Sequence, residues 1–355
     1  MIYLKISYRT HCYNAKPGSK LAEQAKEIIT DHPKVVVGIP VFNGEKYLEA
    51  RLKNLLAQDY PKLDIKISDN CSTDQTQKIC EKYASEHHSI QYVRQKKNLG
   101  PVANFEYILN HADAEFFFFA ATDDENPSNY VRECVVALTA NPHCAACYSR
   151  IKFIEQDGSD LLQEAKDSVI RIAPDFSTEQ KIRHFMIGPP NWLIYSFLNL
   201  RLLNRKLFRM QDYFVARHFE YPWVLGLLLS GSVCGTDKTH FTYRVKRGER
   251  QKGKTGAPPA DPTEGIDRIH TFLGVLRHFS DSPTHEKRNR RALLQAVVQS
   301  HRGCKDWYQM TKHALTWDLL QSYLRTGQWD LVIFFLLMKA MRIKPLRVLI
   351  RQRIY

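Results

Sequence analysis

Two adjacent carboxylates, Asp123 and Asp124, follow the apolar run Phe116–Ala121 after one intervening residue, Thr122. Burying two neighbouring acids at the end of a strand is costly unless a cation or hydrogen-bond donors lie beside them. Hard divalent ions such as Mg²⁺ and Mn²⁺ prefer oxygen ligands and commonly join one or two carboxylates to substrate phosphates. The alternative is a structural role, in which the Asp pair caps the helix expected after Pro127. The spacing alone leaves both interpretations open.

Three other polar segments also follow apolar runs. Asp69 opens the segment Asp69–Asp74, where a carboxylate could accept hydrogen bonds from a nucleobase or ribose, or could help to start the next helix. Pro40–Glu45 follows the first run, and Asn98-Leu99-Gly100 follows the third. Each segment alone is a common loop pattern, so their serial order carries more information than any one of them.

The apolar runs are predicted to be buried parallel strands because they are continuous and rich in β-branched or aromatic residues. They cover Val35–Ile39, Leu63–Ser68, Ile90–Val93 and Phe116–Ala121. Helical spacing predicts intervening helices around Leu48–Leu56, around Ile79 and Tyr83 with Ser72 and Thr73 as N-cap, at Val102–Asn110 and at about Ser128–Ala140. This alternation predicts an α/β fold with a doubly wound, mostly parallel sheet flanked by helices. Ligands of such sheets bind beyond the carboxyl ends of the strands, so all four polar segments should share one edge.

The pattern changes beyond Tyr148. A hairpin-like turn is expected at Gln156–Ser159, helices at Thr178–Ile187 and Gln211–Ser230, and a strand near Val233. Residues 246–265 are rich in Gly, Pro and Lys, which is typical of a mobile loop, and residues 266–355 have a helical pattern. We therefore expect four parts: an N-terminal extension (1–33), an α/β half (34–150), a second half of different pattern (151–250) and a basic, mainly helical C-terminal region (251–355).

The four segments in this order resemble the signature of glycosyltransferase family 2, over residues 34 to about 250 and most clearly before 145. The resemblance implies a GT-A fold and inverting transfer from a nucleotide-sugar donor, with Mn²⁺ or Mg²⁺ as cofactor. It also implies that residues 34–150 are the nucleotide-sugar-binding half of this fold and residues 151–250 the acceptor-binding half. Phe42 resembles the aromatic residue that packs against the nucleobase, and Asp69 the acid that hydrogen-bonds it. Asp123 and Asp124 match the family's Asp pair, which contacts the ribose and holds the metal on the diphosphate. Pro40, Glu45 and Asn98 lie in the matching donor-side motifs. Many members carry a further Asp two residues before the pair, whereas this chain has Ala121.

The resemblance also implies a catalytic base before an apolar helix that ends in Gly. Glu220, in the segment that leads to Gly231, is the best match, and Asp212 is the second candidate. A carboxylate in this role needs a pKa suited to proton transfer. Its alternative is a purely structural one, because a Glu in the first turn favours the helix dipole. Tyr243 and Arg244, expected just after a strand, match a Tyr-Arg element near the family's active site. The basic loop after them either closes over the diphosphate or is a solvated surface loop.

The excess charge of the chain lies in its last third. The net charge is +14, and residues 240–355 hold 22 Lys and Arg against nine Asp and Glu. An apolar stretch from Trp329 to Leu337 precedes the cations Lys339 to Arg353, a pattern that suits an anionic membrane surface or a terminal helix packed on the catalytic domain. Nucleic acid is not expected as a partner, because no known binding module accompanies the charge.

Other features exclude several classes of protein. Eight scattered cysteines do not form a disulfide framework, and the single pair Cys144 and Cys147 lies in an apolar strand-like run. No secretory signal is apparent, and the longest apolar run is too short to span a bilayer. We expect a cytoplasmic protein, peripheral on the membrane if the tail binds it.

The function expected from these features is a metal-assisted single displacement from a nucleotide sugar, with UDP as the first candidate nucleotide, to a hydroxyl of a glycan or lipid-linked acceptor. One alternative is a non-catalytic relative that only binds sugar or nucleotide. The other is a nucleotidyltransferase, although Pro40–Glu45 lacks the Gly-rich, Lys-containing phosphate loop of that class.

Overall fold

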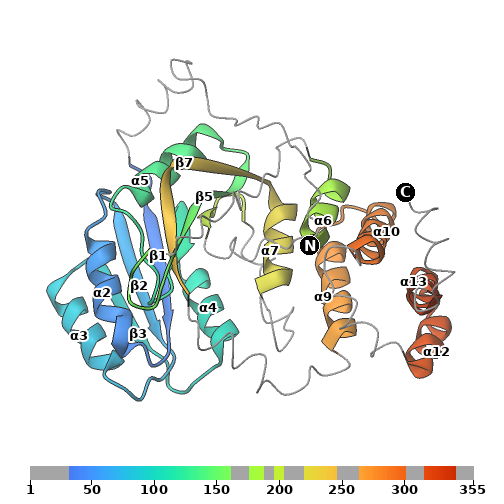
Figure 1. The fold of residues 1–355 in the computed structure, drawn as a ribbon, viewed down its shortest axis with the longest axis horizontal. Helices are drawn as coiled ribbons and strands as arrows, with labels where there is room; N and C mark the ends of the chain where they lie inside the picture. Colours follow the sequence, from blue (N-terminus) through green and yellow to red (C-terminus); the bar gives the residue numbers. More distant parts are fainter. Residues whose placement is uncertain are drawn as a thin grey trace.

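The computed structural model describes residues 32–160, 176–187, 196–203, 220–245, 264–300 and 316–340. One seven-stranded sheet runs through the first part of the molecule, in the order β3-β2-β1-β4-β6-β5-β7. Helices cover it on both faces, and a group of C-terminal helices extends to one side (Figure 1). The α/β class and the doubly wound, mostly parallel sheet predicted from the sequence are confirmed.

The first four strands are parallel and end at one edge. They are β1 (Val35–Val41), β2 (Leu63–Asp69), β3 (Ile90–Arg94) and β4 (Phe116–Phe119), and the helices that link or follow them are α2 (Glu45–Leu56), α3 (Thr76–Glu86), α4 (Pro101–Asn110) and α5 (Tyr130–Ala140). Val41 pairs with Asp69, and Asp69 pairs with Arg94. Because these pairs align the carboxyl ends of three strands, the loops that follow them start side by side.

Both faces of this sheet are buried, which explains the continuous apolar runs. Val35, Val37 and Ile39 point into a core formed with α2, α3 and α5, whereas Val36 points into the core on the opposite face. The four phenylalanines of β4 alternate in the same way and are all buried.

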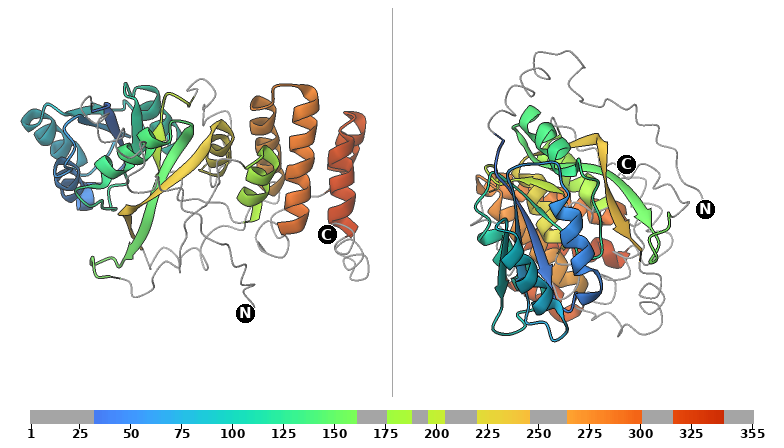
Figure 2. Two further views of the ribbon diagram at one scale, coloured as in Figure 1. Left: turned by 90° about the horizontal axis from the view of Figure 1, so that it is seen from above. Right: turned by 90° about the vertical axis from the view of Figure 1, so that its left-hand side faces the viewer.

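The remaining strands and helices complete the sheet and extend one core. The short β6 (Phe197–Asn199) is antiparallel to β4 and to β5 (Cys144–Ile154), and β5 is parallel to the long β7 (Ser232–Arg244). The helices are α6 (Thr178–Ile187), α7 (Glu220–Ser230), α9 (Glu264–His278), α10 (Pro283–Ser300), α12 (Trp317–Arg325) and α13 (Trp329–Ala340). Buried residues of α7, α9, α10 and α13 share a cluster with Phe117 and Phe119. Figure 2 shows these C-terminal helices standing beside the sheet domain.

The structure corrects several local predictions. Strand β4 ends at Phe119 rather than Ala121, although the Ala120 amide still bonds the Gly38 carbonyl over 2.9 Å. Helix α3 starts at Thr76, so Ser72 and Thr73 do not cap it, because their polar groups bond the neighbouring loop instead. Tyr243 and Arg244 lie inside β7 and not after it.

Other predictions are confirmed or fall outside the described residues. The turn after β5 is present, with Gly158 at φ +91°, and Cys144 and Cys147 are buried in β5. The described part of the C-terminal region is helical, as expected. Asp212, the start of the helix predicted at Gln211, the basic loop 246–263 and the basic tail after Ala340 lie outside the described residues.

Candidate functional site

The loops after β1 and β2 are joined by hydrogen bonds at the carboxyl edge of the sheet. The Asn43 amide donates to Ser72 Oγ over 2.9 Å, and the Thr73 amide donates to Asn43 Oδ1 over 2.9 Å. The Gly44 amide donates to Thr76 Oγ1 over 2.8 Å. Asn43 has a φ of +52°, a conformation that Asn tolerates better than most residues. The first two polar segments therefore form one structural unit.

Glu45 belongs to the same unit. Its amide donates to Asp74 Oδ2 over 3.1 Å, and its own Oε2 accepts the Gln75 amide over 2.8 Å. Burial raises the pKa of Asp74, but hydrogen bonds from Thr76 and Glu45 outweigh this effect and lower it. Glu45, at the end of the loop after β1, thus accepts a backbone amide just before the first residue of α3. The sequence had predicted this capping role for Ser72 and Thr73.

Asp69 lies at the expected edge but beneath the surface. Its side chain is fully buried, Oδ1 accepts the Ser72 amide over 2.8 Å, and Oδ2 accepts the Tyr92 hydroxyl over 3.0 Å. Arg94 Nε lies 3.4 Å from Oδ2. Burial, and then the charge of Asp69, raise the pKa of Tyr92. Asp69 therefore organises the loop after β2 and is covered by Tyr92 and Arg94 of β3.

The loop after β3 is tied to the same edge through Asn98. The Asn70 side-chain amide donates to Asn98 Oδ1 over 2.9 Å, and Asn70 Oδ1 accepts the Leu99 amide over 2.8 Å. The Asn70 backbone amide also donates to the Val41 carbonyl over 2.8 Å. Asn70 therefore connects three of the four predicted segments.

The Asp pair meets Arg244, the last residue of β7. The Arg244 amide donates to Asp124 Oδ1 over 3.2 Å, and its Nε donates to the Asp123 carbonyl over 3.0 Å. The guanidinium also pairs with Glu125 and donates to the carbonyls of Glu155 and Gln156. Asp124 is only 2% exposed, whereas Asp123 is half-buried. The structure thus brings the predicted residues Asp123, Asp124 and Arg244 together.

Arg51 of α2 supports the loop after the Asp pair from inside the protein. It is 1% exposed and donates to Asn126 Oδ1 over 2.7 Å and to Asn54 Oδ1 over 2.8 Å. Asn54 in turn donates to the Asn126 carbonyl, and Gln58 donates to the Pro127 carbonyl, each over 2.8 Å. Burial lowers the pKa of Arg51 to about 10, and the negative charge of Asp124 opposes this shift. Arg51 therefore remains a buried positive charge near the Asp pair at neutral pH.

Phe42 and Pro40 lie on the β1 side of this edge. Phe42 is 49% exposed, which is unusual for so large an apolar side chain and leaves its ring open to a ligand. Pro40 lies within β1, opposite Ser68 of β2. Together, Phe42 and the carboxylates place an apolar surface and an acidic group at the ends of neighbouring strands.

The Asp pair offers carboxylate oxygens, the ligands that a hard divalent ion prefers. Within the described residues, no group of three or more His, Cys, Asp or Glu is placed to hold a metal ion. Two carboxylates such as Asp123 and Asp124 nevertheless suit Mg²⁺ or Mn²⁺ when substrate phosphates and water complete the shell. The residues fit an ion that is held jointly with a diphosphate.

Glu220 is the first residue of α7, and Trp223 in the first turn of this helix is buried. The Trp223 ring packs edge-on against Phe119, the last residue of β4, with 6.1 Å between ring centroids. The first turn of α7 therefore lies beside the carboxyl end of β4, from which Asp123 and Asp124 follow.

Four residues of this site were not predicted from the sequence: Arg51, Tyr92, Arg94 and Asn126. Arg51 carried a usable signal, because it falls on the apolar stripe of Leu48, Leu52 and Leu55 and a charge on a buried stripe needs partners. The roles of the other three depend on contacts between distant segments and have no local signature.

Comparison with known proteins gives a match at the level of the family. A family model described as Glycosyl transferase family 2 matches residues 36–221. Glycosyltransferase GlyA of Streptococcus pneumoniae is 24% identical over 224 residues, which cover 61% of this chain and 31% of that protein. Two further relatives match over shorter segments. Poly(ribitol-phosphate) beta-N-acetylglucosaminyltransferase TarS of Staphylococcus aureus is 36% identical over 93 residues, or 26% of this chain and 16% of that protein. GalNAc(5)-diNAcBac-PP-undecaprenol beta-1,3-glucosyltransferase of Campylobacter jejuni is 34% identical over 94 residues, or 26% and 30%.

A solved structure has the same fold. The crystal structure of S. aureus TarS 1–349 in complex with UDP superposes with a TM-score of 0.54 at 16% identity, over 88% of this chain and 92% of that one. At this identity the likeness concerns the fold alone. The matched segments span less than a third of the curated relatives named above.

Proposed function

Because the chain belongs to glycosyl transferase family 2, we propose that it is an inverting glycosyltransferase that uses a nucleotide-diphosphate sugar, with UDP as the first candidate nucleotide. The main support is the convergence of four loops at one sheet edge, with Asp123, Asp124 and Arg244 in mutual contact. Ligand binding at this edge is the rule in open α/β sheets.

In this proposal the donor's base lies against Phe42. The exposed ring offers a stacking surface, and Asp69 beneath it accepts a base N–H when the Tyr92 hydroxyl gives up its place. Pro40, Glu45 and Asn98 shape the loops that enclose the base and ribose. Asp123, less buried than Asp124, is the carboxylate that meets the ribose.

The diphosphate lies at Asp124 and Arg244. A divalent ion, Mn²⁺ or Mg²⁺, would when bound neutralise the charge of the leaving diphosphate. Asp124 and Asp123 would hold it together with the donor's phosphates. The chain prepares this site through the Arg244 amide, which orients Asp124, and through Arg51, which fixes the following loop.

Glu220 is the proposed base, on the strength of its position at the start of α7. Its carboxylate takes the proton of the acceptor hydroxyl as that oxygen attacks the anomeric carbon. The bond between this carbon and the diphosphate oxygen breaks in the same step, so the configuration inverts.

The acceptor is proposed to be a glycan or a lipid-linked saccharide of the cell envelope. Two of the relatives are named for a poly(ribitol-phosphate) and for an undecaprenol diphosphate glycan. These names support a polymer or lipid-bound acceptor here and leave its sugar open.

A membrane-facing surface on α12 and α13 accords with such an acceptor. Five large apolar side chains are exposed there: Trp317, Leu324, Trp329, Ile333 and Leu336. Trp329, Ile333 and Leu336 recur at helical spacing, while Leu331 and Phe335 face the core. None of the described helices is long and apolar enough to cross a bilayer.

We propose that this stripe and the basic tail bind the cytoplasmic face of an anionic membrane. Replacing Trp329, Ile333 and Leu336 by Ser should abolish flotation with phosphatidylglycerol vesicles. Unchanged flotation would contradict the anchor.

The proposed activity is tested by thermal shift with nucleotide diphosphates, with and without Mn²⁺, on the wild type, Asp124→Ala and Asp113→Ala. Asp113 is an exposed acid before β4, at the opposite edge of the sheet, and serves as control. A ligand that binds only the native state raises its apparent stability. We expect metal-dependent stabilisation by UDP in the wild type and the control, and its loss in Asp124→Ala. Absence of a shift with every nucleotide would contradict the proposal.

The reaction products distinguish the proposed transferase from a nucleotidyltransferase and from a non-catalytic relative. A nucleotidyltransferase would release pyrophosphate, whereas the proposed enzyme releases the nucleoside diphosphate from its sugar donor. Binding of UDP without any turnover would identify a non-catalytic relative.

A further inference from the structure

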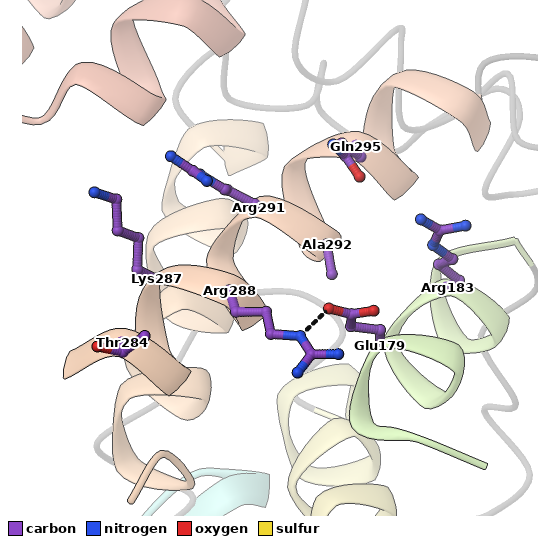
Figure 3. A pocket seen from close by; sticks show the side chains of 8 residues that line it. All are labelled: Glu179, Arg183, Thr284, Lys287, Arg288, Arg291, Ala292 and Gln295. Atoms are coloured by element: carbon purple, nitrogen blue, oxygen red, sulfur yellow. Dashed lines mark hydrogen bonds and ion pairs between the residues drawn. The ribbon is translucent and has the colours of Figure 1, made fainter. Parts of the chain in front are cut away.

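A basic pocket lies between α6 and α10, away from the sheet edge that carries the proposed donor site. Its volume is about 390 Å³, and the side chains that matter here are Glu179, Arg183, Thr284, Lys287, Arg288 and Arg291. Figure 3 shows Glu179 and Arg183 on α6 and the other side chains on α10, with Arg288 turned toward Glu179. The two helices thus form opposite walls of one concave surface.

The pocket has more positive than negative charge. Glu179 is its one acid, and this carboxylate pairs with Arg288, whose guanidinium lowers the Glu179 pKa. Arg183, Lys287 and Arg291 are exposed, and within the described residues no ion pair joins any of the three to an acid. Three cations therefore remain available to an anion from solution.

The charges of α10 are sorted between its two sides. Arg290 bonds Asp330 of α13 through two nitrogens, at 2.8 and 3.1 Å, and lies 3.6 Å from Glu286. Lys287 and Arg291, by contrast, are like charges at i and i+4, an arrangement that destabilises a helix. On the side of α10 that packs on the protein, acids thus neutralise the charge of Arg290. On the pocket side, Lys287 and Arg291 repel each other, and a bound anion would relieve this repulsion.

The pocket is linked to the acceptor side of the proposed enzyme through α6. Lys181 of α6 is buried and donates to the Gly231 carbonyl over 2.9 Å. Gly231 joins α7 to β7, and α7 begins at Glu220, the proposed base. One helix therefore carries a wall of the basic pocket and bonds the C-terminal end of α7, the helix that begins at Glu220.

We propose that the pocket between α6 and α10 binds a phosphate group of the acceptor, as a phosphodiester or a diphosphate. This deepens the proposed function and rests on it. Arg side chains suit phosphate because their planar guanidinium groups donate paired hydrogen bonds. A concave site between two helices fits a phosphate-bearing chain better than it fits the flat surface of a bilayer. The proposed contact with a bilayer is instead the exposed apolar stripe of α12 and α13.

The test measures binding of a soluble inorganic polyphosphate chain to the full-length protein by calorimetry. The variant Lys287→Gln/Arg291→Gln removes two cations at i and i+4 of α10. The control Lys78→Gln/Lys82→Gln removes two exposed cations at the same spacing from α3. We expect Kd to rise about tenfold or more in the α10 variant, the effect of losing one or two charge-assisted hydrogen bonds, and to stay within about twofold in the control. Because the α10 variant loses a repulsion, its Tm without ligand should equal or exceed that of the wild type.

Two results would overturn the proposal. One is the wrong pattern of polyphosphate binding. The wild type would then not bind polyphosphate at all, or both double variants would lose affinity equally, and an equal loss would indicate a general charge effect. The other is loss of binding to phosphatidylglycerol vesicles with unchanged polyphosphate affinity, which would identify a lipid surface as the occupant. The UDP-induced thermal shift is measured on the same proteins. Its absence in the wild type would count against the transferase, whereas its retention in the α10 variant shows that the donor site is intact.

Discussion

The backbone amide of Arg244 lies 3.2 Å from Asp124 Oδ1 and donates a hydrogen bond to it, across 120 positions of sequence. The Arg244 side chain adds bonds to the carbonyls of Asp123, Glu155 and Gln156, and its charge pairs with Glu125. The end of β7 is thereby joined to the loop that carries the Asp pair. Arg244 therefore links the two halves of the proposed catalytic domain at the place where the diphosphate is expected.

Replacing Arg244 with Met should destabilise the fold and weaken donor binding together. The variant loses side-chain bonds to three part-buried carbonyls and the ion pair with Glu125, for which we expect a decrease of about 2 to 4 kcal/mol in the free energy of unfolding. Urea denaturation measures the decrease. Arg150→Met is the control, since Arg150 is an exposed residue of β5 with a weak ion pair to Asp237 at 3.7 Å. A similar decrease in both variants would show that the position of Arg244 is not special.

Replacing Arg51 with Met should loosen the loop after the Asp pair. Asn126 Oδ1 would lose its buried hydrogen-bond partner, which costs about 1 to 3 kcal/mol, whereas Asn54 Oδ1 would still accept the Asn126 backbone amide. The UDP affinity measured in Mn²⁺ should fall as well, because the loop that orients Asp124 is no longer fixed. Lys53→Met, on the exposed face of the same helix, should change neither quantity. Wild-type affinity in a folded Arg51→Met protein would contradict this role.

Replacing Phe42 with Ala should weaken donor binding without affecting stability. Stacking of a base on an aromatic ring contributes about 1 to 3 kcal/mol, so Kd for UDP should rise about 5- to 150-fold. The ring is half-exposed, and its removal should leave Tm nearly unchanged. Leu202→Ala is the control, because Leu202 is 37% exposed and follows β6 at the opposite edge of the sheet. Calorimetry with UDP distinguishes the two variants, and equal Kd values would remove Phe42 from the site.

The packing of α13 on α10 should depend on acidic pH through Asp330. Burial raises the pKa of Asp330, but its bonds with Arg290 outweigh this effect and hold the pKa below the ordinary value of 3.8. Because the folded-state pKa is the lower one, the contribution is fully present above about pH 4 to 5 and is lost as the pH falls through the folded-state value. Asp330→Asn should therefore be less stable than the wild type at pH 7, and the difference should shrink toward pH 2. Tm measured from pH 2 to 7 checks this, and a constant difference would contradict it.

The positions of the polar residues at the strand ends could be predicted from the sequence because the information is local. Strand β1 is apolar along its length since both of its faces are buried, and β4 contributes four consecutive phenylalanines. Alternation of such runs with helical spacing places Phe42, Asp69, Asn98 and Asp123 at one edge, whatever the details of packing. The edge itself was therefore predictable without tertiary structure.

Local patterns could not predict how these residues are used. Ser72 and Thr73 are residue types typical of a helix N-cap. In the structure they form hydrogen bonds with Asn43 of the loop after β1 and do not cap α3. From the sequence, Asp69 is an accessible hydrogen-bond acceptor for a nucleobase. In the structure, Tyr92 and Arg94 of the neighbouring strand cover its carboxylate. Each outcome is a competition between hydrogen-bond partners, and the winner comes from a distant segment.

The α/β alternation, the parallel strands and the acids at their carboxyl ends follow from periodicity and apolar runs within short windows of the chain. In contrast, the burial of Arg51 under the Asp loop, the return of β7 that brings Arg244 to Asp124, and the basic pocket of α6 and α10 arise from packing between distant segments. The physical reason is that a buried charge or a shared pocket is stabilised by partners far away in the chain. Their approach depends on the packing of the whole core rather than on the preference of any one segment.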